Sequence, residues 1–210
     1  MDNKPAPTRR ERQNAARVEQ ILDAAVRLFT EKGFHRTTTR DIADAADVAE
    51  GTLYNYFANK DDLLFGIMQR LTESMTFEAM HTEALPTADT REHFIALLQT
   101  YRDFQYQNAS ILQALLSEIL ANTELRQRYY QQLLEPSILA LEKDLVKHSQ
   151  LGQIRSLDIP ATARVLTSIF IGLFFLDVLG DPMAHSNRSE IEAAIIALGY
   201  EGLAPHLAVE

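Results

Sequence analysis

Cysteine is absent from this chain of 210 residues, and glycine and proline are scarce, at 8 and 7 residues. Without cysteine, the protein can have no disulfide framework, thiolate metal site or thiol nucleophile. The sequence also lacks a glycine-rich phosphate-binding loop and a G-x-S-x-G nucleophile elbow. These absences count against enzymes whose chemistry depends on such motifs.

Long apolar runs are also lacking. The first 20 residues are polar, so we expect no signal peptide and a cytoplasmic location. The most apolar segment, residues 161–180, contains Arg164 and Asp177, which leave about a dozen uncharged residues between them, whereas a membrane span needs about 20. We therefore expect no membrane insertion here, but a helix that is buried on more than one side.

Basic residues are outnumbered, since the net charge is -9. Residues 1–60 contain ten basic and nine acidic residues, whereas residues 61–210 contain ten and twenty. The negative charge therefore lies almost wholly in the C-terminal part, which leaves the N-terminal part free to approach a polyanion. Acidic surfaces are common, so this asymmetry supports nucleic-acid binding only modestly.

Helical periodicity dominates the chain. Apolar residues recur three and four positions apart along most of it, and 46% hydrophobic with 23% charged residues is typical of a globular protein. We predict an all-α fold in which a three-helix N-terminal head continues into a C-terminal bundle without a flexible linker. The expected helices are 14–32, 39–46, a short one carrying Leu53 and Phe57, one after Asn59, 90–107, 110–121, 124–148 with a kink at Pro136, 161–180, and 190–198 with Ser189 and Glu192 as a capping box.

Residues 37–60 predict two short helices joined by a tight turn. Thr38 can cap the first helix, with Asp41 three residues later. Asp47 tolerates the left-handed backbone conformation that a sharp turn needs. The second helix has Leu53 and Phe57 on one face, while its remaining side chains are small, hydroxyl or amide groups. Such a polar face suits a DNA major groove, where base edges present hydrogen-bond donors and acceptors.

The sequence resembles the N-terminal domain of the tetracycline-repressor (TetR/AcrR) family of bacterial transcriptional regulators over about residues 15–65. The segments that carry this resemblance are ILDAAVRLFTEKGFHRTT, T-T-T-R-D-I-A, V-A-E-G-T-L-Y-N-Y-F and N-K-D-D-L-L. The resemblance implies a flexible basic arm at 1–13, a helix-turn-helix DNA-binding domain at 14–60, and a ligand-binding and dimerisation domain at 61–210. It also implies that the partners are double-stranded DNA with a palindromic operator, a second copy of the chain and a small-molecule effector.

Individual DNA contacts follow from the resemblance position by position. Arg40 can bind guanine, Glu50 can accept from cytosine and Asn55 can bind adenine. The alternative is that the tyrosines only pack the head and the lysine is a solvated charge. Ala49 stands where many members have a serine or threonine cap, and loss of a cap costs about 1 kcal/mol. The implied phosphate contacts are Thr39, Tyr54, Tyr56 and Lys60, and the implied base-facing positions are Arg40, Glu50, Gly51, Thr52 and Asn55.

The C-terminal helices supply the remaining expected sites. Their aromatic and methionine residues either line a hydrophobic or amphipathic effector cavity or simply pack a core. The two last predicted helices are expected to form a homodimer interface as a four-helix bundle. The candidate cavity residues are Met75, Phe94, Tyr101, Phe104, Tyr129, Phe170 and Phe174, and the candidate interface residues are Ile171, Phe175, Ile191 and Ile195.

An enzymatic alternative depends on Glu78 and His81. Glu-x-x-His on a helix is half of a carboxylate-bridged di-iron motif, but such a site needs a second copy and none occurs. We therefore expect no enzyme, no metal and no cofactor. The preferred interpretation is a ligand-responsive repressor that a small effector releases from DNA, and the alternative is a helical ligand- or partner-binding protein without specific DNA binding.

Overall fold

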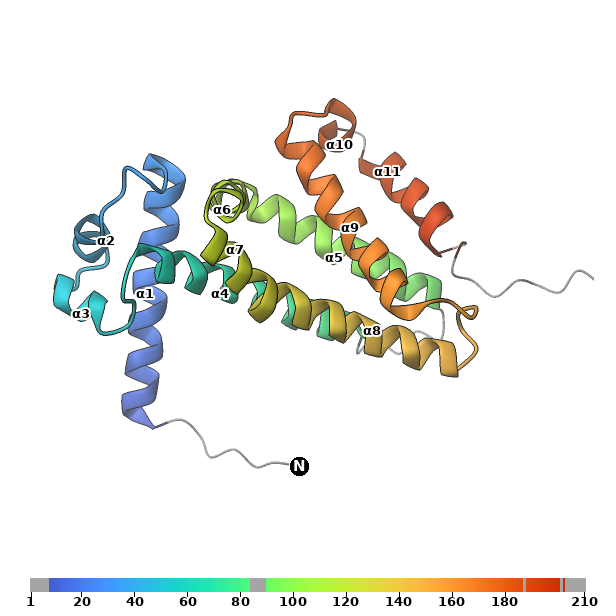
Figure 1. Cartoon of the computed structure of the whole chain (residues 1–210), viewed down its shortest axis with the longest axis horizontal. Coiled ribbons are helices and arrows are strands. Elements are labelled where there is room, and N and C mark those ends of the chain that lie inside the picture. Colours follow the sequence, from blue (N-terminus) through green and yellow to red (C-terminus); the bar gives the residue numbers. More distant parts are fainter. Residues whose placement is uncertain (1–7, 84–89, 187, 201, 203–210) are drawn as a thin grey trace, which may run out of the picture. The chain divides into compact units, whose positions relative to one another are not determined.

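Helices make up all the regular structure in the computed structural model, which describes residues 8–83, 90–186, 188–200 and 202 (Figure 1). The expected all-α fold is confirmed. The helices form two compact units. The first unit contains the described residues up to Leu71 together with Ser110–Arg126, and the second contains Thr72–Ala109 and the described residues that follow Arg126.

The first unit is built on one apolar core. It contains α1 (Arg9–Lys32), α2 (Thr39–Ala45), α3 (Glu50–Tyr54) and the first half of α4 (Lys60–Glu83). Asn59 Oδ1 accepts a 2.9 Å hydrogen bond from the Asp62 amide, which confirms the expected cap of α4. The core side chains Ile21, Phe29, Ile42, Leu53 and Leu64 are at most 1% exposed.

The start of α1 differs from the prediction. Thr8 caps the helix, because its hydroxyl accepts from the Glu11 amide while the Glu11 carboxylate accepts from the Thr8 amide at 2.7 Å. These hydrogen bonds from Thr8 also lower the pKa of Glu11. The expected arm at 1–13 is therefore wrong for Arg9–Gln13, which are helical, and its first seven residues lie outside the described part.

Helix α6 (Ala109–Ala121) packs with the head, although it lies far along the chain. Its buried Glu118 has Oε1 3.2 Å from His35 Nε2, in the turn that follows α1. Asn122, directly after α6, donates a 3.0 Å hydrogen bond to Asp61 at the start of α4. The observed division therefore differs from the predicted boundary at residue 60, because these contacts fasten a later helix to the N-terminal unit.

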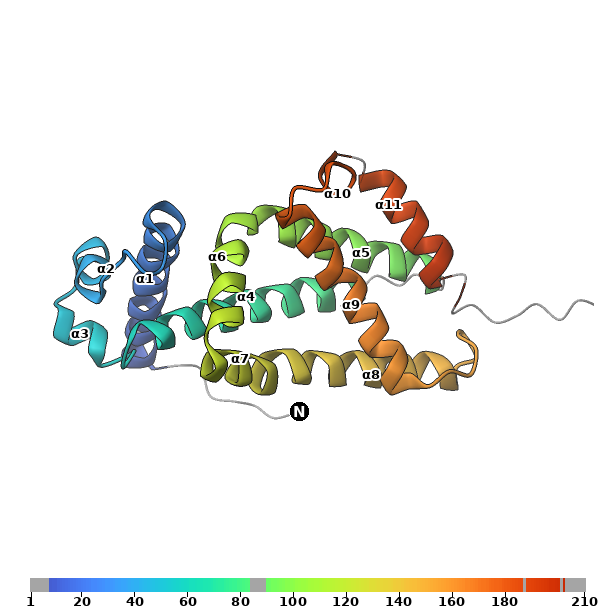
Figure 2. The same cartoon turned by 45° about the horizontal axis from the view of Figure 1, so that its top comes forward.

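The second unit brings together helices from the C-terminal part and α5 (Thr90–Gln107). Helices α8 (Glu135–Gln150) and α9 (Ile159–Val178) pack against each other along a core that includes Ile138, Leu145 and Leu166 (Figure 2). The other elements are α7 (Thr123–Tyr129), which begins in the first unit, the π-helical η1 (Tyr130–Leu134), α10 (Pro182–Ser186), α11 (Arg188–Ile195) and the π-helical η2 (Ile196–Tyr200).

The proline in the predicted helix 124–148 has a specific effect. Pro136 lacks an N–H group and cannot continue the usual hydrogen-bond ladder. The structure inserts the π-helical turn η1 directly before it, where the Glu135 amide bonds to the Tyr130 carbonyl five residues back. The segment is thus divided into α7, η1 and α8 by a change of helix type, whereas one kinked helix was expected.

Helix α9 buries only part of its apolar surface. Ala163 and Leu166 are buried, whereas Val165 and Leu179 are 60% and 69% exposed. The expectation of burial on more than one side is therefore not met within one chain. By length and mean hydropathy of 1.8, α9 could also cross a membrane, a test that apolar helices of soluble proteins pass as well.

The last predicted helix begins earlier and ends differently. Ser189 lies inside α11 rather than at its cap, so the expected capping box is wrong. Glu192 instead pairs with Arg102 of α5. Gly199 does not stop the helix, because it lies within η2 and packs against the Phe94 ring.

Candidate DNA-binding face and ligand cavity

The turn between α2 and α3 is fixed by backbone geometry and two cross-links. Asp47 has φ of 50°, the left-handed conformation that was expected there. The Val48 amide donates to the Ala43 carbonyl at 3.0 Å. Gln20 of α1 donates a 2.7 Å hydrogen bond to the Ala46 carbonyl. The turn is thereby anchored to α1, and the orientation of α3 follows from it.

Capping differs between the two short helices. Thr38 and Asp41 form the expected capping box on α2, and the Thr38 backbone and hydroxyl bonds lower the pKa of Asp41. Ala49, at the N-cap of α3, makes no side-chain hydrogen bond. Leu53 and Phe57 are 0% and 9% exposed, so the inner side of α3 is packed into the core. Packing, rather than capping, therefore positions α3.

Three expected DNA contacts form one hydrogen-bonded cluster. Thr39 Oγ1 lies 3.0 Å from the Tyr54 hydroxyl and donates to Glu50 Oε1 at 3.2 Å. The cluster connects the start of α2 to α3 and lies at the surface. Glu50 thus orients Thr39 from the N-terminal end of α3, where a carboxylate is favourable.

The other base-facing positions are open. Arg40 and Asn55 are exposed, and neither side chain makes a hydrogen bond or ion pair within the described part of the chain. Gly51 is exposed too, and a Cβ added there would meet nothing within 4 Å. Thr52 is half-buried. Internal packing therefore does not require a glycine at position 51.

The remaining two expected phosphate contacts are engaged internally. Lys60 Nζ donates to the carbonyls of Phe34 and Thr37 at 2.7 and 2.9 Å and lies 4.3 Å from the centre of the Phe34 ring. The Tyr56 hydroxyl donates to Asn14 Oδ1 at 3.2 Å. An ammonium group has three N–H donors, so Lys60 retains one that these two carbonyls do not use while it holds the turn before α2.

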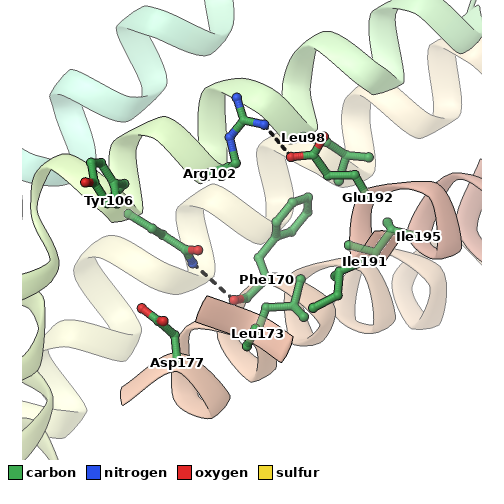
Figure 3. Close-up of a pocket in the computed structure, with 11 residues that line it drawn as sticks. Leu98, Arg102, Tyr106, Phe170, Leu173, Asp177, Ile191, Glu192 and Ile195 are labelled. Atoms are coloured by element: carbon green, nitrogen blue, oxygen red, sulfur yellow. Dashed lines mark hydrogen bonds and ion pairs between the residues drawn. The ribbon is translucent and has the colours of Figure 1, made fainter. Parts of the chain in front are cut away.

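A separate cavity lies in the second unit, between α5, α9 and the segment α10–α11 (Figure 3). Its volume is about 70 Å³. Phe170 projects into it from α9, and the Gln105 amide donates to the Phe170 carbonyl at 3.1 Å. Its walls are mainly apolar, with charged groups from α5, α9 and α11. The lining residues are Leu98, Arg102, Gln105, Tyr106, Phe170, Leu173, Asp177, Ala184, Ile191, Glu192 and Ile195.

Among the described residues of this lining, Arg102 is the one basic side chain. It donates through Nε to Asp103 at 2.8 Å and through Nη1 to Glu192 at 2.5 Å. These two carboxylates raise the pKa of Arg102, the Asp103 hydrogen bond contributing most. Arg102 is therefore a permanent cation at the cavity, and Glu192 of α11 already occupies part of its hydrogen-bonding capacity.

The expected cavity residues only partly coincide with this lining. Phe170 lines the cavity, and Tyr101 stacks on it with ring centroids 4.3 Å apart. Burial raises the pKa of Tyr101 and of Tyr129, so both phenols stay neutral. The other expected residues are not among the described residues of the lining: Phe104 is 8% exposed, Phe94 packs on the α8–α9 core, and Met75 and Phe174 are half-buried.

Known proteins share both the sequence of the head and the fold. Residues 21–67 match the sequence profile described as bacterial regulatory proteins, tetR family. The fatty acid metabolism regulator protein of Bacillus subtilis is 31% identical over 152 residues, which cover 69% of this chain and 74% of that protein. The chain belongs to the tetR family of bacterial transcriptional regulators. The predicted family is thereby confirmed, and members of this family are regulators rather than enzymes.

Solved structures of the family show the same fold. FadR of Bacillus halodurans, a fatty acid degradation regulator, aligns with a TM-score of 0.69 and 23% identity over 88% of this chain and 98% of that one. FadR of Bacillus subtilis, in complex with stearoyl-CoA, aligns with a TM-score of 0.69 and 24% identity over 86% and 96% of the two chains.

The candidate interface residues of this tetR-family chain separate into two groups. Ile171 and Phe175 are exposed on α9, as an interface requires. Ile191 and Ile195, expected at the same interface, line the cavity, and their place at an interface stays a prediction. Sequence reasoning missed the contact between Arg102 and Glu192, which lie 90 residues apart, because no local pattern connects them.

The Glu-x-x-His motif of the enzymatic alternative is not described by the structure, since the side chains of Glu78 and His81 lie outside the described residues.

Proposed function

We propose that this protein is a transcriptional repressor that binds a palindromic operator as a homodimer and is released by an amphipathic acyl effector. The exposed polar face of α2 and α3 carries the proposal. Arg40 and Asn55 on that face are unpaired within the described residues, and a guanidinium and an amide are the groups that read guanine and adenine.

Each residue of the face has a defined role in this proposal. Arg40 and Asn55 contact base edges, and Gly51 allows the backbone to approach the DNA. Thr39 and Tyr54 exchange their mutual hydrogen bond for phosphate oxygens. Glu50 orients Thr39 and does not read a base, since its carboxylate already accepts the Thr39 hydroxyl and would repel phosphate.

The homodimer is proposed from the apolar surface of α9. Its side opposite the α8–α9 core exposes a group of large apolar side chains, and burial of such a surface is favourable by about 25 cal/mol per Å². A twofold axis there presents two heads to a palindromic site. These residues are Val165, Ile171, Phe175, Leu176 and Leu179, at 40% to 69% exposure.

A long-chain acyl thioester is the proposed effector. The cavity combines apolar walls with one cation, Arg102, which suits a molecule with an apolar chain and an anionic head. Two of the similar proteins are named as regulators of fatty acid metabolism or degradation, and the Bacillus subtilis structure contains stearoyl-CoA. Their names and that ligand support the same effector class for this chain.

Two helices connect the ligand unit with the head unit. Helix α4 begins in the first unit and continues past Leu71 into the second, while α5 leads directly into α6, which packs with the head. Ligand binding that displaces α4 or α5 therefore alters the spacing of the two heads. Since successive major grooves on one face are about 34 Å apart, a changed spacing shifts the population away from the DNA-competent state.

A direct test uses fluorescence anisotropy of a labelled duplex that carries the palindrome upstream of the protein's own gene. We expect this duplex to bind at least about 1,000-fold more tightly than a scrambled duplex at physiological salt. Stearoyl-CoA should release it, whereas free coenzyme A should not. Equal binding of both duplexes would contradict specific repression and favour a helical ligand- or partner-binding protein.

A further inference from the structure

The ion pair between Arg102 and Glu192 crosses the cavity from α5 to α11 (Figure 3). Among the α11 side chains that the structure describes, Glu192 is the one with a hydrogen bond or ion pair to another helix. Both side chains are partly shielded, since Arg102 is 36% and Glu192 23% exposed. The pair therefore fastens α11 to α5 at the cavity.

The cavity is too small for a long acyl chain in this arrangement. A volume of about 70 Å³ has room for a few water molecules only. Ligand entry must therefore move one wall. Helix α11 packs mainly on its chain neighbours α10 and η2, so we take it as the wall that moves.

The charge of the lining creates a competition for Arg102. Glu192 and Asp103 supply two carboxylates against this one guanidinium. An incoming anion would meet net negative charge as long as Glu192 stays in place, and like charges at one site are unfavourable. Once Glu192 leaves, Arg102 can bind the new anion in the bidentate manner of guanidinium groups.

We infer that Arg102 and Glu192 form a clasp that the anionic head of the effector opens by replacing the Glu192 carboxylate on Arg102. The inference rests on the proposed ligand-sensing function and assigns its recognition chemistry. The matching ligand is an acyl chain with an anionic head, either a fatty-acid carboxylate or the phosphates of an acyl-CoA. Opening the clasp releases α11, which widens the cavity for the chain.

Calorimetric titration of the full-length protein tests the clasp. The ligands are lauroyl-CoA, laurate and the neutral dodecanol. Glu192→Gln removes the competing charge while it keeps the side-chain shape, so it should bind the anionic ligands roughly tenfold more tightly and dodecanol unchanged. Arg102→Gln should weaken only anionic binding, by about tenfold or more. Glu190→Gln is the matched control on the same helix and should change neither.

The preferred anion is decided by the ligand series. Tighter binding of lauroyl-CoA than of laurate assigns the phosphates to Arg102, and the reverse assigns the carboxylate; either result supports the clasp. Affinities of Glu192→Gln within twofold of the wild type for all three ligands would overturn it. Wild-type protein that binds the operator but neither anionic ligand would also overturn it, while the DNA-binding part of the proposed function would stand.

A second measurement follows the movement itself and does not depend on affinity. The chain has no cysteine, so spin labels can be placed without background at the exposed positions of Gln99→Cys on α5 and Ala194→Cys on α11. We expect the distance distribution between the labels to lengthen when lauroyl-CoA is added. In the Glu192→Gln background the longer distances should be populated without ligand. Unchanged distances in both experiments would overturn the inference.

Discussion

Two exposed surfaces of this molecule differ in the chemistry they leave unsatisfied. The α2–α3 face displays hydroxyl, amide and guanidinium groups, with Arg40 and Asn55 unpaired in the described structure. The outer side of α9 displays aliphatic and aromatic carbon, including Ile171 and Phe175 at 47% and 40% exposure. Contact with a polar, charged partner is favourable for the first surface, and contact with an apolar partner is favourable for the second. The difference fits the two proposed partners, DNA and a second subunit.

The largest effect is expected from placing a charge on the apolar surface. Phe175→Lys would bury an unpaired ammonium at the proposed interface, which costs several kcal/mol. We expect the dimer to dissociate at least about 100-fold more readily, measured by sedimentation velocity, and operator affinity to fall with it. Val146→Lys changes an exposed apolar residue on α8 and should leave the dimer intact. A dimer unaffected by Phe175→Lys would place the interface elsewhere.

On the polar surface, Arg40→Ala removes a direct base contact. We expect operator affinity to fall by roughly 5- to 150-fold, with less discrimination between operator and scrambled duplex. Anisotropy titrations measure both. Arg36→Ala is the control, because Arg36 is exposed in the same unit but bonds to the Lys32 carbonyl, before α2. Equal losses for the two variants would show a general charge effect instead of base readout.

Lys60→Ala tests whether this side chain supports the head or only binds phosphate. Removing the ammonium leaves the Phe34 and Thr37 carbonyls without their donor. We expect the protein to lose about 1–3 kcal/mol of unfolding free energy in urea titrations, besides any loss of DNA affinity. Lys32→Ala, an exposed lysine of the same unit, provides the comparison. Unchanged stability would assign Lys60 to phosphate binding alone.

The smallest effect is expected at the uncapped start of α3. Ala49→Ser supplies a hydroxyl that can accept from the first turn, and a cap contributes about 1 kcal/mol. We expect a rise in Tm of a few degrees, measured by thermal unfolding, with operator affinity equal or higher. A fall in stability would indicate that the Ala49 methyl group makes a packing contribution larger than a cap.

Local patterns in the sequence were sufficient to predict the caps and the turn of the head. The Thr38 and Asp41 capping box, the left-handed Asp47 and the uncapped Ala49 are each decided by residues within a few positions, and all were predicted correctly. The start of α1 was missed although the signal is local, because Thr8 and Glu11 were read as part of a polar arm.

Contacts between segments that are far apart in the chain could not be predicted from the sequence. Glu118 on an apolar helix gives no sign that it meets His35, and Glu192 was assigned to a local cap although it pairs with Arg102. An aromatic side chain at helical spacing can equally line a cavity or fill a core, so Phe170 and Phe104 could not be separated before their surroundings were known. Tertiary packing decides such cases.

Hydroxyl-radical footprinting of the wild-type protein on its own upstream palindrome tests both surfaces in one measurement. The polar face should protect the sugar–phosphate backbone on both sides of the major groove that it enters, and the proposed α9 dimer should place a second head in a twofold-related position. We predict two equivalent protected regions centred about 34 Å apart along one side of the duplex, both lost when stearoyl-CoA is added. A single protected region, or uniform protection that stearoyl-CoA does not change, would contradict the account.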